Sequence, residues 1–204
     1  MLFDDRYKTI EAPVEGIFRD RGSKFIAYAY PIRHEEEVKR YVSLLKSEHP
    51  KARHHCWAMR LSPDRSVFRL NDDGEPVGTA GRPILNTILS NDLTNILIVV
   101  VRYFGGTLLG VPGLINAYKT AAAEALTAAN IIELTVNEHY SVSFDYLQMN
   151  DVMKTIKDNG IKIVSQTLEN NCCIELEIPK AQLNTILAKL EKIEHLTLKY
   201  LRTT

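Results

Sequence analysis

The hydrophobic and polar positions of the first 130 residues predict strands and helices in alternation. Residues 14–20 and 24–32 are rich in β-branched and aromatic residues and predict two strands joined by a tight turn. Residues 95–104 are almost continuously apolar, which is typical of a strand buried on both faces of a sheet. Further strands are expected at 52–61 and 66–70, and helices at 34–50, 83–89 and 114–129.

The pattern changes beyond residue 132, because eleven of the twelve arginines precede that point. Strands are expected at 138–144, 161–168, 172–178 and 196–201, and helices at 148–159 and 180–193. This β-α-β-β-α-β order is the ferredoxin-like pattern. The sequence therefore predicts two α+β domains, residues 1–134 and 135–204, with the boundary near 132–137.

Composition narrows the class of protein. The chain has 25 basic and 25 acidic residues and a formal net charge of zero, which excludes the strongly basic type of nucleic-acid binder. Its three cysteines include no C-x-x-C pair, so a structural zinc site has no starting point and a reducing compartment is indicated. The N-terminus has early acids and no apolar run, and no stretch approaches the roughly 20 apolar residues of a membrane span. We expect a cytoplasmic protein without a membrane partner.

The first polar cluster lies at residues 70–83. Asp72, Asp73 and Glu75 crowd together ahead of a predicted helix that Thr79 and glycines precede. Because free N–H groups point outward at a helix N-terminus, this segment could bind an anion, and its acids could hold Mg²⁺ or pair with arginines. The alternative is a tight turn whose acids accept hydrogen bonds from neighbouring N–H groups, and we favour it over metal binding. No other cofactor is expected.

The second cluster, residues 102–114, joins the buried strand to an Ala-rich helix. Strand, glycine loop and helix is a layout that binds phosphates, but this loop matches neither G-x-G-x-x-G nor the P-loop pattern. Gly105 and Gly106 could equally serve close packing of the helix on the sheet. Arg102 and Tyr103, at the end of the strand, suit a phosphate and a base.

The third cluster is the strand predicted at residues 51–60. Alternation places His54 and Cys56 on one face, and Arg53 and His55 on the other. A catalytic Cys–His pair is disfavoured because side chains two apart on a strand stand parallel. A half-buried strand with a basic outer face is the better interpretation.

In this order, the three segments resemble the YigZ/IMPACT family. The residues that carry the likeness are Ser23-Lys24-Phe25-Ile26-Ala27, then Ala52, His54, Cys56 and Ala58, then Asp72-Asp73-Gly74-Glu75-Pro76, Gly78-Thr79-Ala80-Gly81 and Pro83, and finally Val100-Val101-Arg102-Tyr103-Phe104-Gly105-Gly106, Leu109-Gly110, Gly113-Leu114 and Ala117-Tyr118. One departure is Val111-Pro112, where relatives usually carry a glycine. Proline lacks an N–H donor, which weakens the loop as a phosphate cradle, although it suits the first turn of a helix.

The resemblance implies a first domain of the superfold shared by ribosomal proteins and domain IV of elongation factor G. It implies a second, ferredoxin-like domain similar to domain V of that factor. By fold analogy, it also implies contact with RNA or the ribosome. Eukaryotic relatives act in translational control through a stress-kinase activator, by way of an additional N-terminal domain. Since the likeness begins within the first 25 residues, we do not expect that partner here.

We therefore expect a cytoplasmic, translation-related regulator, non-enzymatic in the preferred interpretation, that binds RNA or the ribosome through a polar face. The expected contact residues are His54, Thr79, Arg82, Arg102, Tyr103, Gly105 and Gly106, with Asp72, Asp73 and Glu75 as acidic partners or a metal site. No catalytic residue is assigned, and a translation-associated protein could be a further partner. Two alternatives remain: a metal-assisted enzyme acting on a phosphorylated small molecule with His54 as acid or base, and a protein–protein adaptor working through the C-terminal sheet.

Overall fold

The structure is a computed structural model that describes residues 5–169 and 171–204. It divides into two compact units, Tyr7–Leu134 and Thr135–Thr204, and Asp5 and Arg6 group with the second. The first part of the chain contains β1 (Arg6–Ile10), β2 (Val14–Asp20), β3 (Ser23–Pro31), α1 (Glu36–Glu48), β4 (His54–Leu61), β5 (Val67–Asn71), α2 (Gly81–Ser90), β6 (Ile96–Tyr103), α3 (Gly110–Thr127) and β7 (Ile131–Thr135).

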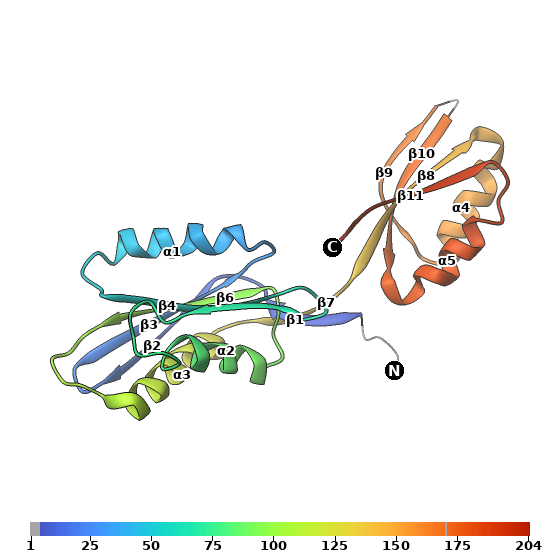
Figure 1. Ribbon diagram of the computed structural model, residues 1–204. Helices are drawn as coiled ribbons and strands as arrows, with labels where there is room; N and C mark the ends of the chain where they lie inside the picture. The colour runs from blue at the N-terminus through green and yellow to red at the C-terminus, as the bar shows by residue number, and fades with distance from the viewer. Residues whose placement is uncertain (1–4, 170) are drawn as a thin grey trace. The chain divides into compact units, whose positions relative to one another are not determined.

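An antiparallel sheet of five strands, in the order β2-β3-β6-β4-β5, is the centre of the first unit. Helix α1 covers one face of this sheet, and α2 and α3 cover the other (Figure 1). Strand β6 lies in the middle, and every residue from Ile96 to Arg102 is buried. The prediction of a strand buried on both faces is confirmed.

The two faces of β4 belong to two different cores. Cys56 and Ala58 pack in the core under α2 and α3, whereas Trp57 and Met59 pack under α1. The predicted alternation is therefore confirmed, but the predicted basic outer face is wrong: His55 is buried. Because helices cover both faces of the sheet, alternation separates one core from another and not core from solvent.

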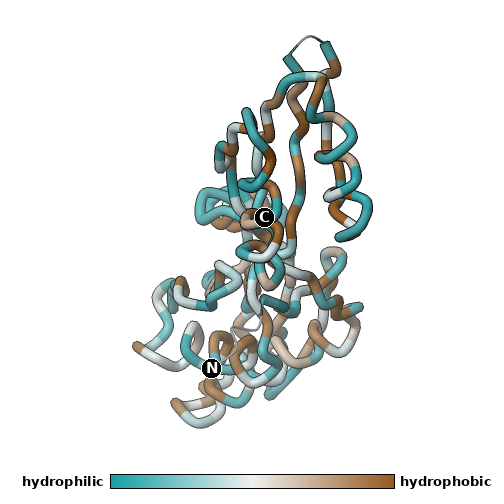
Figure 2. The backbone as a smooth tube through the Cα atoms, turned by 90° about the vertical axis from the view of Figure 1, so that its right-hand side faces the viewer, coloured by the Kyte–Doolittle hydropathy of each residue, from teal (hydrophilic) through white to brown (hydrophobic). Residues whose placement is uncertain are grey.

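The second unit contains β8 (Asn137–Asp145), α4 (Met149–Asp158), β9 (Lys162–Leu168), β10 (Asn171–Pro179), α5 (Leu183–Leu190) and β11 (Leu196–Thr203), with short 3₁₀ turns η1 (Tyr146–Gln148) and η2 (Lys180–Gln182). Its antiparallel sheet has the order β11-β8-β10-β9. Apolar and polar residues alternate along the chain (Figure 2), and the apolar residues of both helices pack against the sheet in one core. The predicted β-α-β-β-α-β order is thus observed, and both units are α+β. The two superfold names stay predictions from the resemblance.

Two short strands that the sequence did not predict, β1 and β7, pair in a separate two-stranded sheet. Just before β1, the Asp5 carbonyl accepts a hydrogen bond from Val136 N at 2.7 Å, and its carboxylate accepts one from Ala181 N at 2.9 Å. These contacts explain why the start of the described chain groups with the second unit. The turn expected at residues 170–171 falls partly outside the described residues. Within those residues, no helix combines the length and apolar character that a membrane crossing requires.

Candidate functional site

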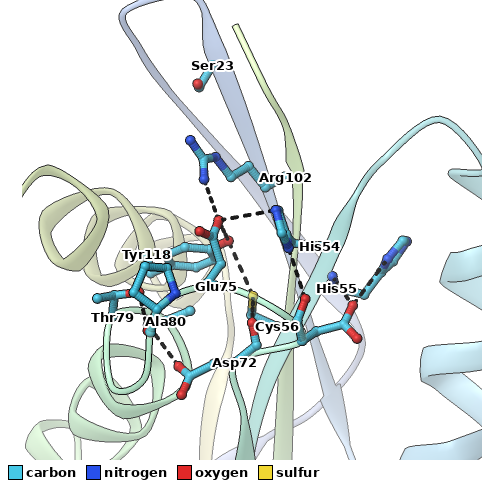
Figure 3. A network of polar contacts seen from close by, with 12 residues as sticks. Ser23, His54, His55, Cys56, Asp72, Glu75, Thr79, Ala80, Arg102 and Tyr118 are labelled. Atoms are coloured by element: carbon cyan, nitrogen blue, oxygen red, sulfur yellow. Dashed lines mark hydrogen bonds and ion pairs between the residues drawn. The ribbon is translucent and has the colours of Figure 1, made fainter. Parts of the chain in front are cut away.

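The acidic and glycine-rich segments meet at one end of the five-stranded sheet. His54, the first residue of β4, lies opposite Arg102, the penultimate residue of β6, in the antiparallel register. The turn between β5 and α2 brings Glu75 to the same place (Figure 3). The sequence prediction that these segments come together beside His54 is therefore met by the geometry.

Glu75 is the hub of this site. Its Oε1 accepts hydrogen bonds from Arg102 Nη1 and, at 2.8 Å, from the Tyr118 hydroxyl, and it lies 4.0 Å from His54 Nε2. Only 4% of the Glu75 side chain and 6% of the Arg102 side chain are exposed. A buried carboxylate is tolerable only with such partners, so Glu75 and Arg102 depend on each other. The sequence predicted that acids of this segment could pair with arginines, and the structure pairs Glu75 with Arg102.

Beneath Glu75, Tyr118 and Cys56 extend the network into the core. The Cys56 Sγ lies 3.3 Å from the Tyr118 hydroxyl and 3.0 Å from the Asp72 carbonyl oxygen. Burial, with the neighbouring Cys56 and Glu75, raises the pKa of Tyr118, and burial raises the pKa of the Cys56 thiol. Both groups therefore stay protonated at neutral pH. A protonated thiol is a poor nucleophile, in agreement with the prediction that disfavours a catalytic Cys–His pair.

Asp72 occupies the N-terminus of α2. Its Oδ1 accepts hydrogen bonds from Ala80 N at 3.1 Å and Gly81 N at 2.8 Å, and its Oδ2 accepts one from Gly78 N at 2.9 Å. Thr79 is buried, and its hydroxyl donates to the Pro76 carbonyl at 2.7 Å. The expected anion site at this helix end is wrong, because the chain's own carboxylate satisfies the N–H groups.

Asp73 points to a different neighbour again. Its Oδ2 accepts a hydrogen bond from His55 N at 2.7 Å, and its carbonyl accepts one from His54 Nδ1 at 2.9 Å. The three acids thus diverge toward α2, β4 and Arg102 and do not form a joint site for Mg²⁺. Among residues 5–169 and 171–204, no group of three His, Cys, Asp or Glu side chains is arranged to hold a metal.

Two predicted contact residues lie elsewhere. Tyr103 points to the α1 face, where its hydroxyl lies 2.8 Å from His49 Nδ1. The expectation that Arg102 and Tyr103 meet one ligand side by side is wrong, since successive strand residues point to opposite faces. Arg82 is exposed on α2 and does not line the cleft described below.

The two glycines that end β6 differ in role. A Cβ at Gly105 would collide with the backbone of Gly22 and Ser23, and Gly105 N donates to Ser23 Oγ at 3.1 Å. Gly105 therefore serves close packing, whereas Gly106, with φ of +88°, faces open space. The loop ends sooner than expected, because α3 begins at Gly110 and Pro112 lies in its first turn.

A cleft of about 530 Å³ opens over His54, Glu75 and Arg102. A second part of its lining, the apolar wall, consists of Phe104, Leu108, Leu109, Val111 and Leu114, with Gly110 beside them. Phe104 is 47% exposed, Leu108 81% and Val111 52%. Sequence reasoning missed this wall, although a Leu-Leu pair within a glycine loop was a signal that could have found it. Arg53 and Pro76 complete the rim.

Comparisons with known proteins agree with this arrangement. The Impact N-terminal domain family model matches residues 21–126. An IMPACT family member of Haemophilus influenzae is 34% identical over 173 residues, which are 82% of each chain. The IMPACT family member YigZ of Escherichia coli is 32% identical over 181 residues, 88% of this chain and 89% of the relative.

A solved structure described as a hypothetical protein is similar to nearly the whole chain. It is 30% identical, covers 97% of this chain and 98% of its own, and superposes with a TM-score of 0.72. The residues that the family model matches include those that converge on Glu75 and the cleft, and the relatives extend the likeness into the second unit. The chain belongs to the IMPACT family.

Proposed function

We propose that this protein is a translation-related regulator that binds RNA or the ribosome through the cleft of its first unit. Membership of the IMPACT family supports the link to translation, because the resemblance to its eukaryotic members implies translational control. The cleft supports the link to RNA, because it combines basic groups with an exposed aromatic ring. Basic groups suit the phosphates of RNA, and an exposed aromatic ring suits its bases.

The observation that carries the proposal is the unfinished hydrogen bonding of Arg102. Its Nη1 is paired with Glu75, but its buried Nε has no hydrogen-bond partner among the described residues. A guanidinium has five N–H donors, and leaving a buried donor unpaired costs about 1–3 kcal/mol. Because Arg102 lines the cleft, a phosphate oxygen bound there could accept from the unpaired side of the guanidinium.

The groups around Arg102 suit the same ligand. Arg53, His54 and the exposed Phe104 ring line the same cleft. The Arg102 guanidinium carbon is 5.6 Å from the centre of that ring. Phe104 thus takes the stacking role that the sequence had assigned to Tyr103. A net charge of zero for the whole chain does not oppose RNA binding here, because the lining of the cleft has two arginines, Arg53 and Arg102, and one acid, Glu75.

A filter-binding titration with single-stranded RNA tests the proposal. We expect binding at low salt that weakens steeply as salt rises, since phosphate contacts release counterions. Arg102→Lys keeps a positive charge beside Glu75 but loses the forked donor geometry, so it should weaken binding while the protein stays folded. Absence of RNA affinity at low salt would overturn the proposal.

One observation favours the second candidate, an enzyme acting on a phosphorylated small molecule. Because His54 Nδ1 donates to the Asp73 carbonyl, the ring orientation is fixed, with Nε2 on the side of Glu75 at the base of the cleft. A fixed imidazole of this kind could act as a general base without a metal. Phosphate release from a panel of phosphorylated metabolites, lost in His54→Gln, would establish this candidate in place of the first.

A further inference from the structure

We propose that the cleft is a site for one nucleoside monophosphate unit, with the phosphoryl group at Arg102 and the N-terminus of α3, and the base against the apolar wall. This inference rests on the proposed function and names the ligand of the same site. The unit could belong to an unpaired residue of RNA or to a free nucleotide, and the experiment below separates these two sources.

The N-terminus of α3 has no side-chain cap. This helix has 18 residues, its N-cap position Leu109 makes no side-chain capping bond, and its first turn has no acidic residue. Gly110 and Val111, the first two helical residues, line the cleft. Their N–H groups lack helical acceptors, and the helix dipole adds positive potential at this point.

The N-terminus of α2 differs from that of α3 in having a carboxylate of the chain bound to it. At α2 the chain supplies its own anion, the Asp72 carboxylate, which accepts three backbone hydrogen bonds. At α3 no carboxylate among the described residues performs this task, although Pro112 removes one of the donors. The uncapped helix end and the incompletely paired guanidinium of Arg102 are independent observations, and residues of both line one cleft. Together they point to an anion with several acceptor oxygens.

The apolar wall selects what the anion is attached to. Phe104, Leu108 and Val111 expose large apolar side chains beside the polar base of the cleft. Such exposure typically marks a binding surface, and an exposed ring is a stacking partner for a base. A ligand with a phosphoryl group at one end and a planar ring at the other fits both walls.

The dimensions favour a single unit over a duplex. A volume of about 530 Å³ lies in the range of pockets for small ligands. Double-stranded RNA is bound mostly through phosphates and 2′-hydroxyls across a broad surface, whereas unpaired residues can be splayed out and stacked on aromatic side chains. The cleft therefore fits one unpaired residue, held at its base and at its 5′ phosphate.

Ligand-observed NMR with the full chain tests the inference, with 5′-AMP, adenosine and inorganic phosphate as separate probes. We expect 5′-AMP to bind more tightly than either fragment, because only 5′-AMP reaches both walls. In parallel, fluorescence anisotropy with a labelled single-stranded oligoribonucleotide measures RNA affinity under the same conditions.

Phe104→Ala is the decisive variant, and Phe68→Ala is its matched control. The two rings are almost equally exposed, at 47% and 46%, but Phe68 lies on β5 and does not line the cleft. Loss of one stacking contact should reduce the affinity for 5′-AMP and for RNA about tenfold. Phe68→Ala should leave both affinities unchanged.

The outcomes separate the inference from the proposed function. If RNA binds but 5′-AMP does not, and Phe104→Ala has no effect, the inference is wrong and the RNA function stands. If 5′-AMP binds and depends on Phe104 while RNA does not bind, the inference stands and the RNA function is wrong. Binding of inorganic phosphate as tightly as 5′-AMP would also overturn the inference, since the apolar wall would then contribute nothing.

Discussion

One arginine–glutamate pair of the first unit and one of the second unit differ in burial. Arg102 and Glu75 in the first unit have 6% and 4% of their side chains exposed. Arg202 and Glu175 in the second unit have 50% and 19% exposed, with an Nη2–Oε1 distance of 2.7 Å. In the second pair, Glu175 also lies 2.9 Å from His139 Nδ1.

The two pairs have the same charged groups but differ in what they contribute to stability, because one is buried and the other is exposed. Water screens the exposed pair and can satisfy its remaining donors, so that pair contributes little to stability. The buried pair has no such help, and neither partner can be removed without leaving the other unpaired. A donor left over in the buried pair is a candidate contact for a ligand, whereas a donor left over in the exposed pair is satisfied by solvent.

The largest expected effect comes from breaking the buried pair. Arg102→Ala should lower the free energy of unfolding by about 3–5 kcal/mol, because Glu75 is left buried without its cation. Urea denaturation measures the change, and Arg202→Ala, with an expected loss of under about 1 kcal/mol, is the matched control. Equal losses in both variants would contradict the comparison.

Replacing both members of the buried pair separates stability from binding. The double variant Arg102→Met with Glu75→Gln removes both charges and leaves an amide oxygen to accept from the Tyr118 hydroxyl. It should recover more than half of the stability lost in Arg102→Ala, since a neutral pair of similar volume avoids burying a lone charge. The double variant should not bind RNA, because it lacks the Arg102 guanidinium. A double variant that binds RNA normally would show that Arg102 is structural only.

Acidification should sharpen the contrast between buried and exposed groups through His55. Burial lowers the pKa of His55, against the opposing charge of Asp73 and with help from Lys46 and His49. Because the folded pKa lies below the unfolded value of about 6.5, stability is lost as the pH falls below that value. His55→Gln should therefore show a flatter loss of stability between pH 7 and pH 5 in urea denaturation. His34→Gln, at an exposed position, should behave like the parent protein.

The smallest effect is expected at the exposed pair. The hydrogen bond with His139, and then Arg202, lowers the pKa of Glu175. The stability that this carboxylate contributes is present above its unfolded pKa and is lost as the pH falls through the lowered folded value. Glu175→Gln should differ slightly from the parent protein at neutral pH, and the difference should vanish in strong acid. A difference that grows on acidification would contradict this assignment.

The strands and helices were largely predictable because their periodicities were strong. The alternation along residues 54–61 assigned side chains to the correct faces, but it could not reveal that α1 covers the second face. The start of α3 was predicted at Leu114 instead of Gly110, because two glycines and a proline in the first turn are typical of a loop. Strands β1 and β7 were missed, although β5, which also has five residues, was predicted.

The site was predictable in its location more than in its chemistry. The meeting of Glu75, His54 and Arg102 followed from motifs that the sequence displays. That acids of this turn accept hydrogen bonds from neighbouring N–H groups was the favoured interpretation, and Asp72 does so. That Thr79 turns inward to the Pro76 carbonyl was not predicted, because its hydroxyl could equally have faced a ligand. The apolar wall was missed because exposed leucines in a loop resemble ordinary core residues until the fold shows that nothing covers them.

The most direct test of RNA binding at the cleft is a titration of the ¹⁵N-labelled protein with single-stranded RNA at low salt. RNA binding at the cleft predicts amide shifts concentrated at Arg53, His54, Arg102 and residues 104–111, with α1 and β11 unchanged. Shifts concentrated on the α1 face or in the second unit, or no shifts at all, would contradict it.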